Sequence, residues 1–199
     1  MRGIHGLRRS GVARHVVSLA VVLGLGAVSG CGSKAAPAAA TCDQACIDGI
    51  ALRSVRETLK LVFNLTLQGN ATGPQDETTA CPQGGTARVY GLATSNSVQG
   101  ATMIDLTYEL DHCAYLSKNS TATRNYDVTI TGTVTEVGTL AVQPTANTAL
   151  LLDSMALGIT GTVNDPPSDY HRDPCPLKVT QNGSDVTGTW CGAPVSFSF

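Results

Sequence analysis

Residues 43–67 carry apolar side chains at steps of three and four positions. These apolar positions are Ile47, Ile50, Ala51, Val55, Leu59, Val62 and Leu65. Five polar residues fall on the opposite side of a helical wheel: Arg53, Arg56, Glu57, Lys60 and Asn64. A repeat near 3.6 residues predicts one amphipathic helix. Thr41 or Asp43 is expected to cap its start, and residues 69–70 to end it.

Beyond residue 80 the apolar spacing changes to two, which predicts β-strands with one buried and one exposed face. The clearest runs are residues 104–110, 126–134 and 151–163, and the last places Leu151, Met155, Leu157 and Ile159 on one face. Further strands are predicted at 86–94, 177–181, 184–191 and 195–199, with turns at 84–85, 99–100, 118–119 and 182–183. Residues 68–80 lack alternation and are predicted to form a polar loop.

A short pattern recurs in three of these strands. Residues 130–134 and 159–163 both have the sequence ITGTV, residues 186–190 have VTGTW, and residues 89–93 (VYGLA) form a weaker fourth copy. Each central glycine takes a place where a side chain would face inward, which marks a bend or a close approach of another backbone. The sequence therefore predicts an α+β, mainly β fold. Its curved antiparallel sheet of about 7–8 strands would pack on one N-terminal amphipathic helix.

The first 30 residues have the three parts of a signal peptide. Residues 1–15 are basic and lack acidic residues, and residues 16–28 are apolar or small. This apolar run is shorter than the roughly 20 residues that span a membrane. The segment ends in Val28-Ser29-Gly30-Cys31, which resembles the lipobox of bacterial lipoproteins. The resemblance implies cleavage before Cys31 and its lipidation; an ordinary secretory signal that contains a cysteine is the alternative.

The lipobox resemblance also predicts a location. Gly32, not Asp, follows the lipidated cysteine, and by analogy with well-studied diderm bacteria this directs the protein to the outer membrane. Residues 31–41 would form the lipidated cysteine and an Ala/Pro tether, whose ten residues after the cysteine reach roughly 33 Å when extended. Residues 42–199 would then form a single domain, so the expected partner is a membrane, held through the anchor.

Charge and cysteine content agree with an exported protein. Four of the 13 basic residues precede residue 31, so the remaining chain carries nine basic and 15 acidic residues, a formal charge of −6. This charge argues against nucleic acid and against anionic lipid headgroups as partners. Six cysteines remain after Cys31, and an even number in an oxidising compartment predicts disulfides. Zinc binding is the alternative, although only Cys42 and Cys46 have the spacing of a zinc knuckle.

Strand order predicts how the six cysteines pair. The start of one antiparallel strand lies beside the end of its partner, which favours Cys81–Cys113 and Cys175–Cys191 and leaves Cys42–Cys46. Fifteen pairings of six cysteines exist. Residues 81–85, a Cys-Pro-Gln-Gly-Gly turn before Thr-rich strands, resemble those of uncharacterised bacterial envelope lipoproteins. That resemblance implies no activity.

Candidate chemistry is sparse. His112 and His171 are weak metal-ligand candidates, each beside acidic residues, and would bind an ion only if their two segments meet. His112 is expected to end a strand, and His171 to lie in an exposed Pro-rich loop. The chain contains no G-x-S-x-G, S-x-x-K or H-E-x-x-H motif. Trp190 is expected to pack in the core, and the sequence predicts neither a cofactor nor catalytic residues.

Three functions are compatible with these features. The first is a non-enzymatic envelope lipoprotein, a structural or protein-interaction module, which a filled core between helix and sheet would favour. The second is a carrier or binding protein for an apolar ligand, a lipid or a lipoprotein, which a cavity between helix and sheet would favour. The third is a hydrolase, which a cleft joining His171 to Asp111 or His112 would favour.

Overall fold

The computed structural model describes residues 42–69, 72–96, 101–141 and 148–198. The leader, Cys31, the Ala/Pro segment and the predicted turn at 99–100 lie outside the described residues. The elements are, in chain order, α1 (Gln44–Thr66), β1 (Gly73–Ala80), β2 (Thr86–Asn96), β3 (Ala101–Ser117), the 3₁₀ helix η1 (Ala122–Arg124), β4 (Tyr126–Ala141), β5 (Ala149–Val163), β6 (Ser168–Asn182), β7 (Asp185–Trp190) and β8 (Ala193–Ser198).

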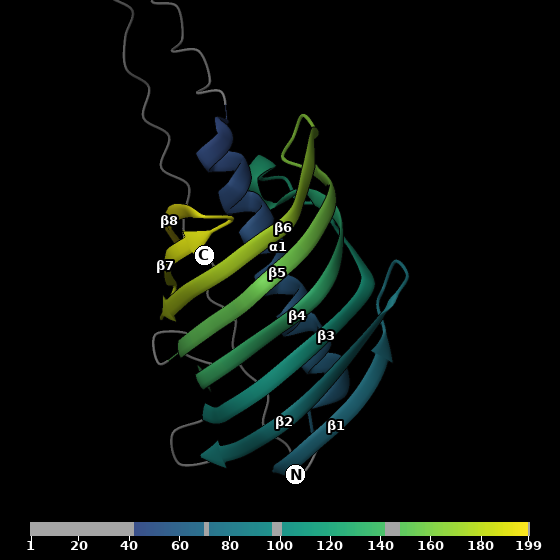
Figure 1. The fold of residues 1–199 in the computed structure, drawn as a ribbon, viewed down its shortest axis with the longest axis vertical. Helices are drawn as coiled ribbons and strands as arrows, with labels where there is room; N and C mark the ends of the chain where they lie inside the picture. The colour runs from purple at the N-terminus through teal and green to yellow at the C-terminus, as the bar shows by residue number, and fades with distance from the viewer. Residues whose placement is uncertain (1–41, 70–71, 97–100, 142–147, 199) are drawn as a thin grey trace, which may run out of the picture. The chain divides into compact units, whose positions relative to one another are not determined.

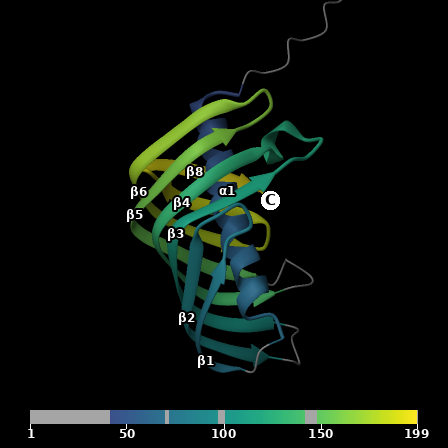
Figure 2. The same ribbon diagram turned by 90° about the vertical axis from the view of Figure 1, so that its right-hand side faces the viewer.

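The eight strands form one antiparallel sheet in which each strand pairs with the next along the chain. β1 and β8 each pair on one side only, so the sheet is open. The sheet bends around α1 and holds the helix on its concave side (Figure 1). Figure 2 shows the same strands wrapping past the helix, with β8 close to α1. The predicted curved antiparallel sheet with one N-terminal helix is confirmed.

Helix α1 begins and packs largely as its pattern predicts. The side chain of Asp43 accepts a hydrogen bond from the backbone N–H of Cys46 at 2.9 Å, which makes Asp43 the N-cap. Two positions differ from the prediction. Arg56, expected on the solvent side, is buried, and Leu65, expected on the packed side, is 54% exposed. Arg56 is buried because the sheet offers its guanidinium polar partners, described below.

The core lies between α1 and the concave face of the sheet. It joins the helix residues Ile50, Val55 and Leu59 to alternate residues of the strands. The predicted inward sets of β3 and β4 are confirmed at Ile104, Leu106, Tyr108, Leu110, Tyr126, Val128, Ile130 and Val134, all buried. Trp190 is fully buried, as predicted.

The glycines of the repeat lie where the backbone of a neighbouring strand comes close. Gly161 and Gly188 have φ angles of +143° and +147°, values that residues with side chains rarely adopt. A Cβ at Gly161 would overlap the backbone carbonyl of Asp127 on β4. One at Gly188 would overlap that of Lys178 on β6. Close backbone approach explains why these strands have glycine there, as the sequence pattern predicts.

A β-bulge makes the predicted face of β5 wrong in its first half. The pairing of β5 with β6 shifts between Ser154 and Leu157, because two residues of β5 lie opposite one of β6. Side chains before the bulge therefore alternate in the opposite phase from those after it. Leu151 and Met155, predicted to share the face of Leu157, are 40% and 88% exposed.

Two strands lie where loops were predicted. β1 occupies residues 73–80 of the predicted polar loop; it is an edge strand with no fully buried side chain, so apolar alternation could not reveal it. β6 begins at Ser168, nine residues before the predicted strand, and so includes His171. Irregular pairing near Asp173 and Pro174 lets the strand continue through this Pro-rich stretch.

Three disulfides tie the fold together, and they are the pairs expected from the sequence. Cys42–Cys46 lies at the start of α1, with a Cα–Cα distance of 5.3 Å. Cys81–Cys113 joins the turn after β1 to β3, and Cys175–Cys191 joins β6 to the residue after β7. Each bond fixes a different part of the sheet or helix start.

Candidate functional site

An open groove of about 620 Å³ lies between the first half of α1, η1 and strand β8. We call it the helix–β8 groove. It is lined by Gln44, Ala45, Cys46, Asp48, Gly49, Ile50, Arg53, Thr123 and residues 193–197. Most of this lining is apolar or small, and the volume falls in the range of ligand pockets, about 300–1,000 Å³.

The helix wall of the groove is held by its own N-terminus. The Cys42–Cys46 disulfide and the Asp43 cap both constrain the first turn of α1. The backbone N–H of Ile47 also donates to the carbonyl of Asp43 at 2.9 Å. A fixed first turn keeps Ala45 and Gly49 in place on the wall.

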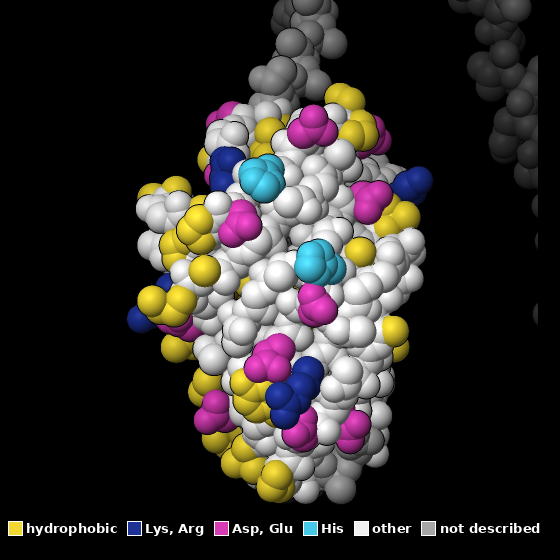
Figure 3. All heavy atoms as spheres, turned by 45° about the vertical axis from the view of Figure 1, so that its right-hand side comes forward, with side chains coloured by type: hydrophobic (Ala, Val, Ile, Leu, Met, Phe, Trp, Pro, Cys, Tyr) yellow, Lys and Arg dark blue, Asp and Glu magenta, His cyan; other side chains and the backbone are white. Residues whose placement is uncertain are grey.

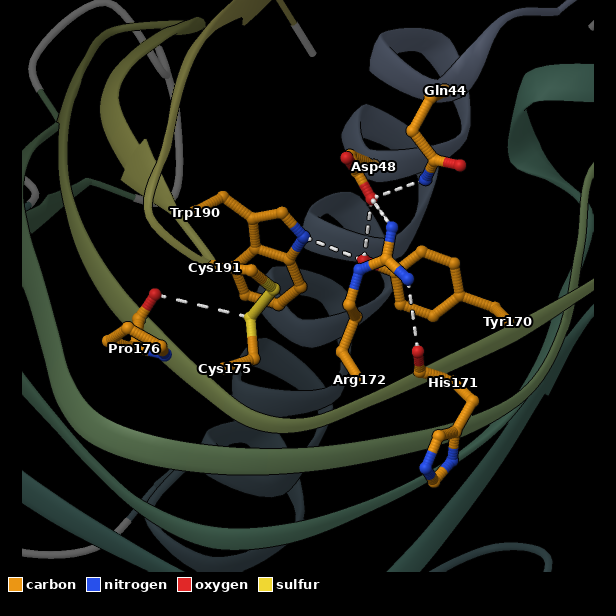
Figure 4. The surroundings of a disulfide bond; sticks show 9 residues. All are labelled: Gln44, Asp48, Tyr170, His171, Arg172, Cys175, Pro176, Trp190 and Cys191. Carbon is orange, nitrogen blue, oxygen red and sulfur yellow. Dashed lines mark hydrogen bonds and ion pairs between the residues drawn. A yellow bond between two sulfur atoms is a disulfide. The ribbon is translucent and has the colours of Figure 1, made fainter.

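A partly buried polar network joins α1 to β6 and β7 beside the groove (Figure 4). The hydroxyl of Tyr170 donates to Asp48 at 2.9 Å and accepts from the indole N–H of Trp190 at 2.8 Å. Arg172 reaches the same carboxylate at 3.5 Å, and Gln44 donates to it at 3.0 Å. Burial raises the pKa of Tyr170, so its hydroxyl remains a donor at neutral pH.

The β8 wall is fastened to the helix by Arg53. Its guanidinium donates to the backbone carbonyl of Ser198 at 2.8 Å. It also lies 5.5 Å from the ring centroid of Phe197, within cation–π range. Burial, and then the positive charge of Arg124, lower the pKa of Arg53. Two guanidinium groups therefore lie close enough to repel each other at this end of the groove.

A second, polar pocket of about 290 Å³ adjoins the groove, and Arg53 lines both. Its other lining residues are Glu57, Tyr115, Ser117, Asn119, Arg124 and Tyr126. We call it the arginine pocket. It offers two cations and one carboxylate, and the tyrosine rings of residues 115 and 126 pack at 5.7 Å between centroids. The two hollows together give one surface with an apolar part and a basic part.

The space between helix and sheet is filled, not hollow. A small cavity between α1 and the sheet, lined by residues such as Leu52, Val179 and Phe197, has a volume of only about 10 Å³. Beside it lies a buried ion pair in which Arg56 approaches Glu136 at 3.5 Å. Tyr108 donates to Glu136 at 2.8 Å, and Arg56 donates to Gln181 at 2.8 Å. These contacts fix the position of α1 on the sheet; solvent does not reach them.

The two histidines lie apart on the outer face. His112 sits at the bulge of β3, 76% exposed, with its Nδ1 2.7 Å from a carboxylate oxygen of Asp111. His171 lies on β6, and β4 and β5 separate the two strands. Figure 3 shows the histidine side chains as separate cyan patches, and Figure 4 shows the ring of His171 pointing away from Asp48. Among the described residues, no three His, Cys, Asp or Glu side chains gather as a metal site.

The outer face also carries exposed apolar side chains. Leu92, Met103, Val137 and Leu151 are 40–58% exposed and lie on four adjacent strands. Val137 pairs directly with Leu151, and Asp105 lies between Leu92 and Val137 in the register. We call these four residues the outer patch. Contiguous exposed apolar patches mark contact surfaces, and here Asp105 interrupts the apolar surface.

The groove residues were not predicted from the sequence. They come from α1, η1 and β8, three elements far apart in the chain, and no local motif joins them. The buried carboxylate of Glu136 could have been found, because it continues the alternation of Ile130 and Val134. Comparison with protein-family models, curated proteins and solved structures finds no match to this chain. No helix among the described residues is long and apolar enough to cross a membrane.

Proposed function

We propose that this chain is a non-enzymatic binding protein of the bacterial cell envelope, anchored to the outer membrane by lipid at Cys31. The helix–β8 groove is its ligand site. The observation that carries this proposal is the open, largely apolar groove of about 620 Å³ between α1 and β8. A ligand binds at the open side of the fold, between α1 and β8, without displacing the core.

Two further observations support a role in binding without catalysis. All six cysteines in the described part of the chain are in disulfides, so none is available as a thiol nucleophile. His112 and His171 lie on the outer face, away from the groove. The groove instead has rigid walls, because one disulfide and the Asp48–Tyr170–Trp190 network fix its borders.

Filling the groove tests the proposal. A Cβ placed on Gly49 meets no atom within 4 Å, so Gly49→Trp adds a large side chain to the groove without a backbone clash. The same change replaces a poor helix former. The variant is made in the mature chain carrying Cys31→Ser, secreted with an ordinary signal peptide. The control is Asn64→Trp, an exposed position on the same helix outside the groove.

Native mass spectrometry of gently purified protein is the measurement. We expect a bound adduct on the parent chain and on Asn64→Trp, and its loss from Gly49→Trp. An adduct that survives in Gly49→Trp would contradict the groove as the ligand site.

A protein-interaction module is the second candidate, and both the filled space between helix and sheet and the outer patch favour it. Chemical cross-linking in whole envelopes separates the two functions. A cross-linked partner that persists in Gly49→Trp but disappears in Leu151→Lys would assign the function to the outer patch. A cross-linked partner that disappears only in Gly49→Trp would assign the function to the groove.

A further inference from the structure

We infer that the occupant of the helix–β8 groove is a single-chain anionic amphiphile, with its acyl chain along β8 and its acidic head at the arginine pocket. This inference rests on the proposed function of the groove and names the class of its ligand. The shared position of Arg53 in both hollows carries it. The apolar helix–β8 groove adjoins the arginine pocket, and this arrangement matches a molecule with an apolar tail and a negative head.

The apolar half of the match comes from the groove walls. Ala45 and Ile50 of α1 face Val195 and Phe197 of β8 across the groove. Phe197 is half-buried against the core, so its ring forms part of the groove floor. An acyl chain bound against these side chains is removed from water, which favours binding.

The charged half of the match comes from Arg53 and Arg124. Arg124 is exposed in the last turn of η1 and lies in the arginine pocket with Arg53. Glu57 is the one carboxylate lining that pocket. The carboxylate of Asp48 lines the groove, but Tyr170, Gln44 and Arg172 already contact it. Arg53 already donates to the carbonyl of Ser198, so the exposed guanidinium of Arg124 supplies the contact for an acidic head, and Arg53 adds positive charge beside it.

An extended peptide is a poorer occupant, because two backbone groups of β8 are unavailable for strand addition. Strand addition requires free N–H and C=O groups along the edge. Pro194 has no N–H, and the carbonyl of Ser198 already accepts from Arg53. A lipid needs no such ladder, only the apolar walls and the basic end.

Equilibrium binding of three probes to the mature Cys31→Ser chain tests the inference. Palmitate has both features, hexadecanol has the same chain without the charge, and butyrate has the charge without the chain. All are used below their aggregation limits. We expect palmitate to bind most tightly, hexadecanol more weakly, and butyrate not measurably.

Two variants locate the tail and the head. Gly49→Trp is expected to abolish binding of palmitate and hexadecanol. Arg124→Gln is expected to weaken palmitate about three- to five-fold, as for an exposed ion pair, and to leave hexadecanol unchanged. The charge-matched control is Lys178→Gln, on the outer face beside Asp153, which is expected to change neither.

The outcomes separate this inference from the proposed function. Equal affinity for palmitate and hexadecanol, or no effect of Arg124→Gln, would overturn the anionic ligand while leaving the groove as a site. A peptide adduct that Gly49→Trp removes would also overturn the anionic ligand and leave the groove as a site. Palmitate binding that Gly49→Trp leaves intact would overturn both.

Discussion

The two free edges of the sheet, β1 and β8, differ in the charge of their side chains. β1 carries Asp76 and Glu77, and Arg88 of β2 forms two hydrogen bonds to Asp76 and approaches Glu109 of β3. β8 has no charged residue within its bounds and borders the helix–β8 groove. Charges on an edge strand discourage other chains from pairing there. The comparison indicates that charge insulates the β1 edge, whereas the β8 edge is uncharged and borders the groove that we propose as the ligand site.

The two edges are also held in different ways. On the β1 side, Cys81–Cys113 and an exposed charge network join neighbouring strands. On the β8 side, buried groups reach across the fold, because Trp190 of β7 donates to Tyr170 of β6, which in turn donates to Asp48 of α1. The groove is therefore held by buried side chains that join three elements, and the β1 edge by a buried disulfide together with exposed charges.

The largest expected effect comes from Trp190→Ala. Trp190 is fully buried, so its removal leaves a cavity and takes a donor away from Tyr170. We expect a loss of about 3–5 kcal/mol in the free energy of unfolding, measured by urea denaturation. The matched change on the other side is Tyr90→Ala in β2, which is only partly buried and is expected to cost about 1 kcal/mol. Similar losses in the two variants would remove this distinction between the edges.

Deleting each disulfide sharpens the same comparison. Cys81–Cys113 and Cys175–Cys191 join residues 32 and 16 positions apart, so chain entropy gives similar losses of about 3–4 kcal/mol each. Paired Cys→Ala variants are compared by thermal unfolding and by native mass spectrometry. We expect only the Cys175/Cys191 variant to lose the groove ligand at a temperature where both remain folded. Loss in the Cys81/Cys113 variant instead would show that the β1 side supports the site.

How far the sequence predicts the structure also differs between these regions. Long strands with one buried face, such as β3 and β4, are visible because the period of two persists over many residues. β1 was not predicted because an edge strand needs little apolar surface. The buried face of the first half of β5 was predicted wrongly because a bulge shifts the alternation by one residue. The burial of Arg56 was not predicted because its partner Glu136 lies 80 positions away, beyond the reach of helical periodicity. The groove is a tertiary feature that only the folded chain brings together.

The smallest expected effect concerns the charge network at the β1 edge. The hydrogen bonds from Arg88 hold the pKa of the exposed Asp76 carboxyl below its usual range. A carboxyl with a lowered folded-state pKa stabilises the fold above its unfolded-state pKa. That contribution is lost as pH falls through the folded-state value. Arg88→Gln is therefore expected to raise the pKa of Asp76 toward that of a free side chain and to flatten the stability profile in this acidic range.

Carbon-detected NMR titration of the Asp76 carboxyl measures this shift directly. High salt should reproduce part of the effect, because the pair is exposed and screened. The control is Lys178→Gln, which removes an outer-face cation between β5 and β6 and should leave Asp76 unchanged. An Asp76 pKa that does not respond to Arg88→Gln would mean that β1 is insulated by its backbone geometry alone. Charge would then no longer distinguish it from β8.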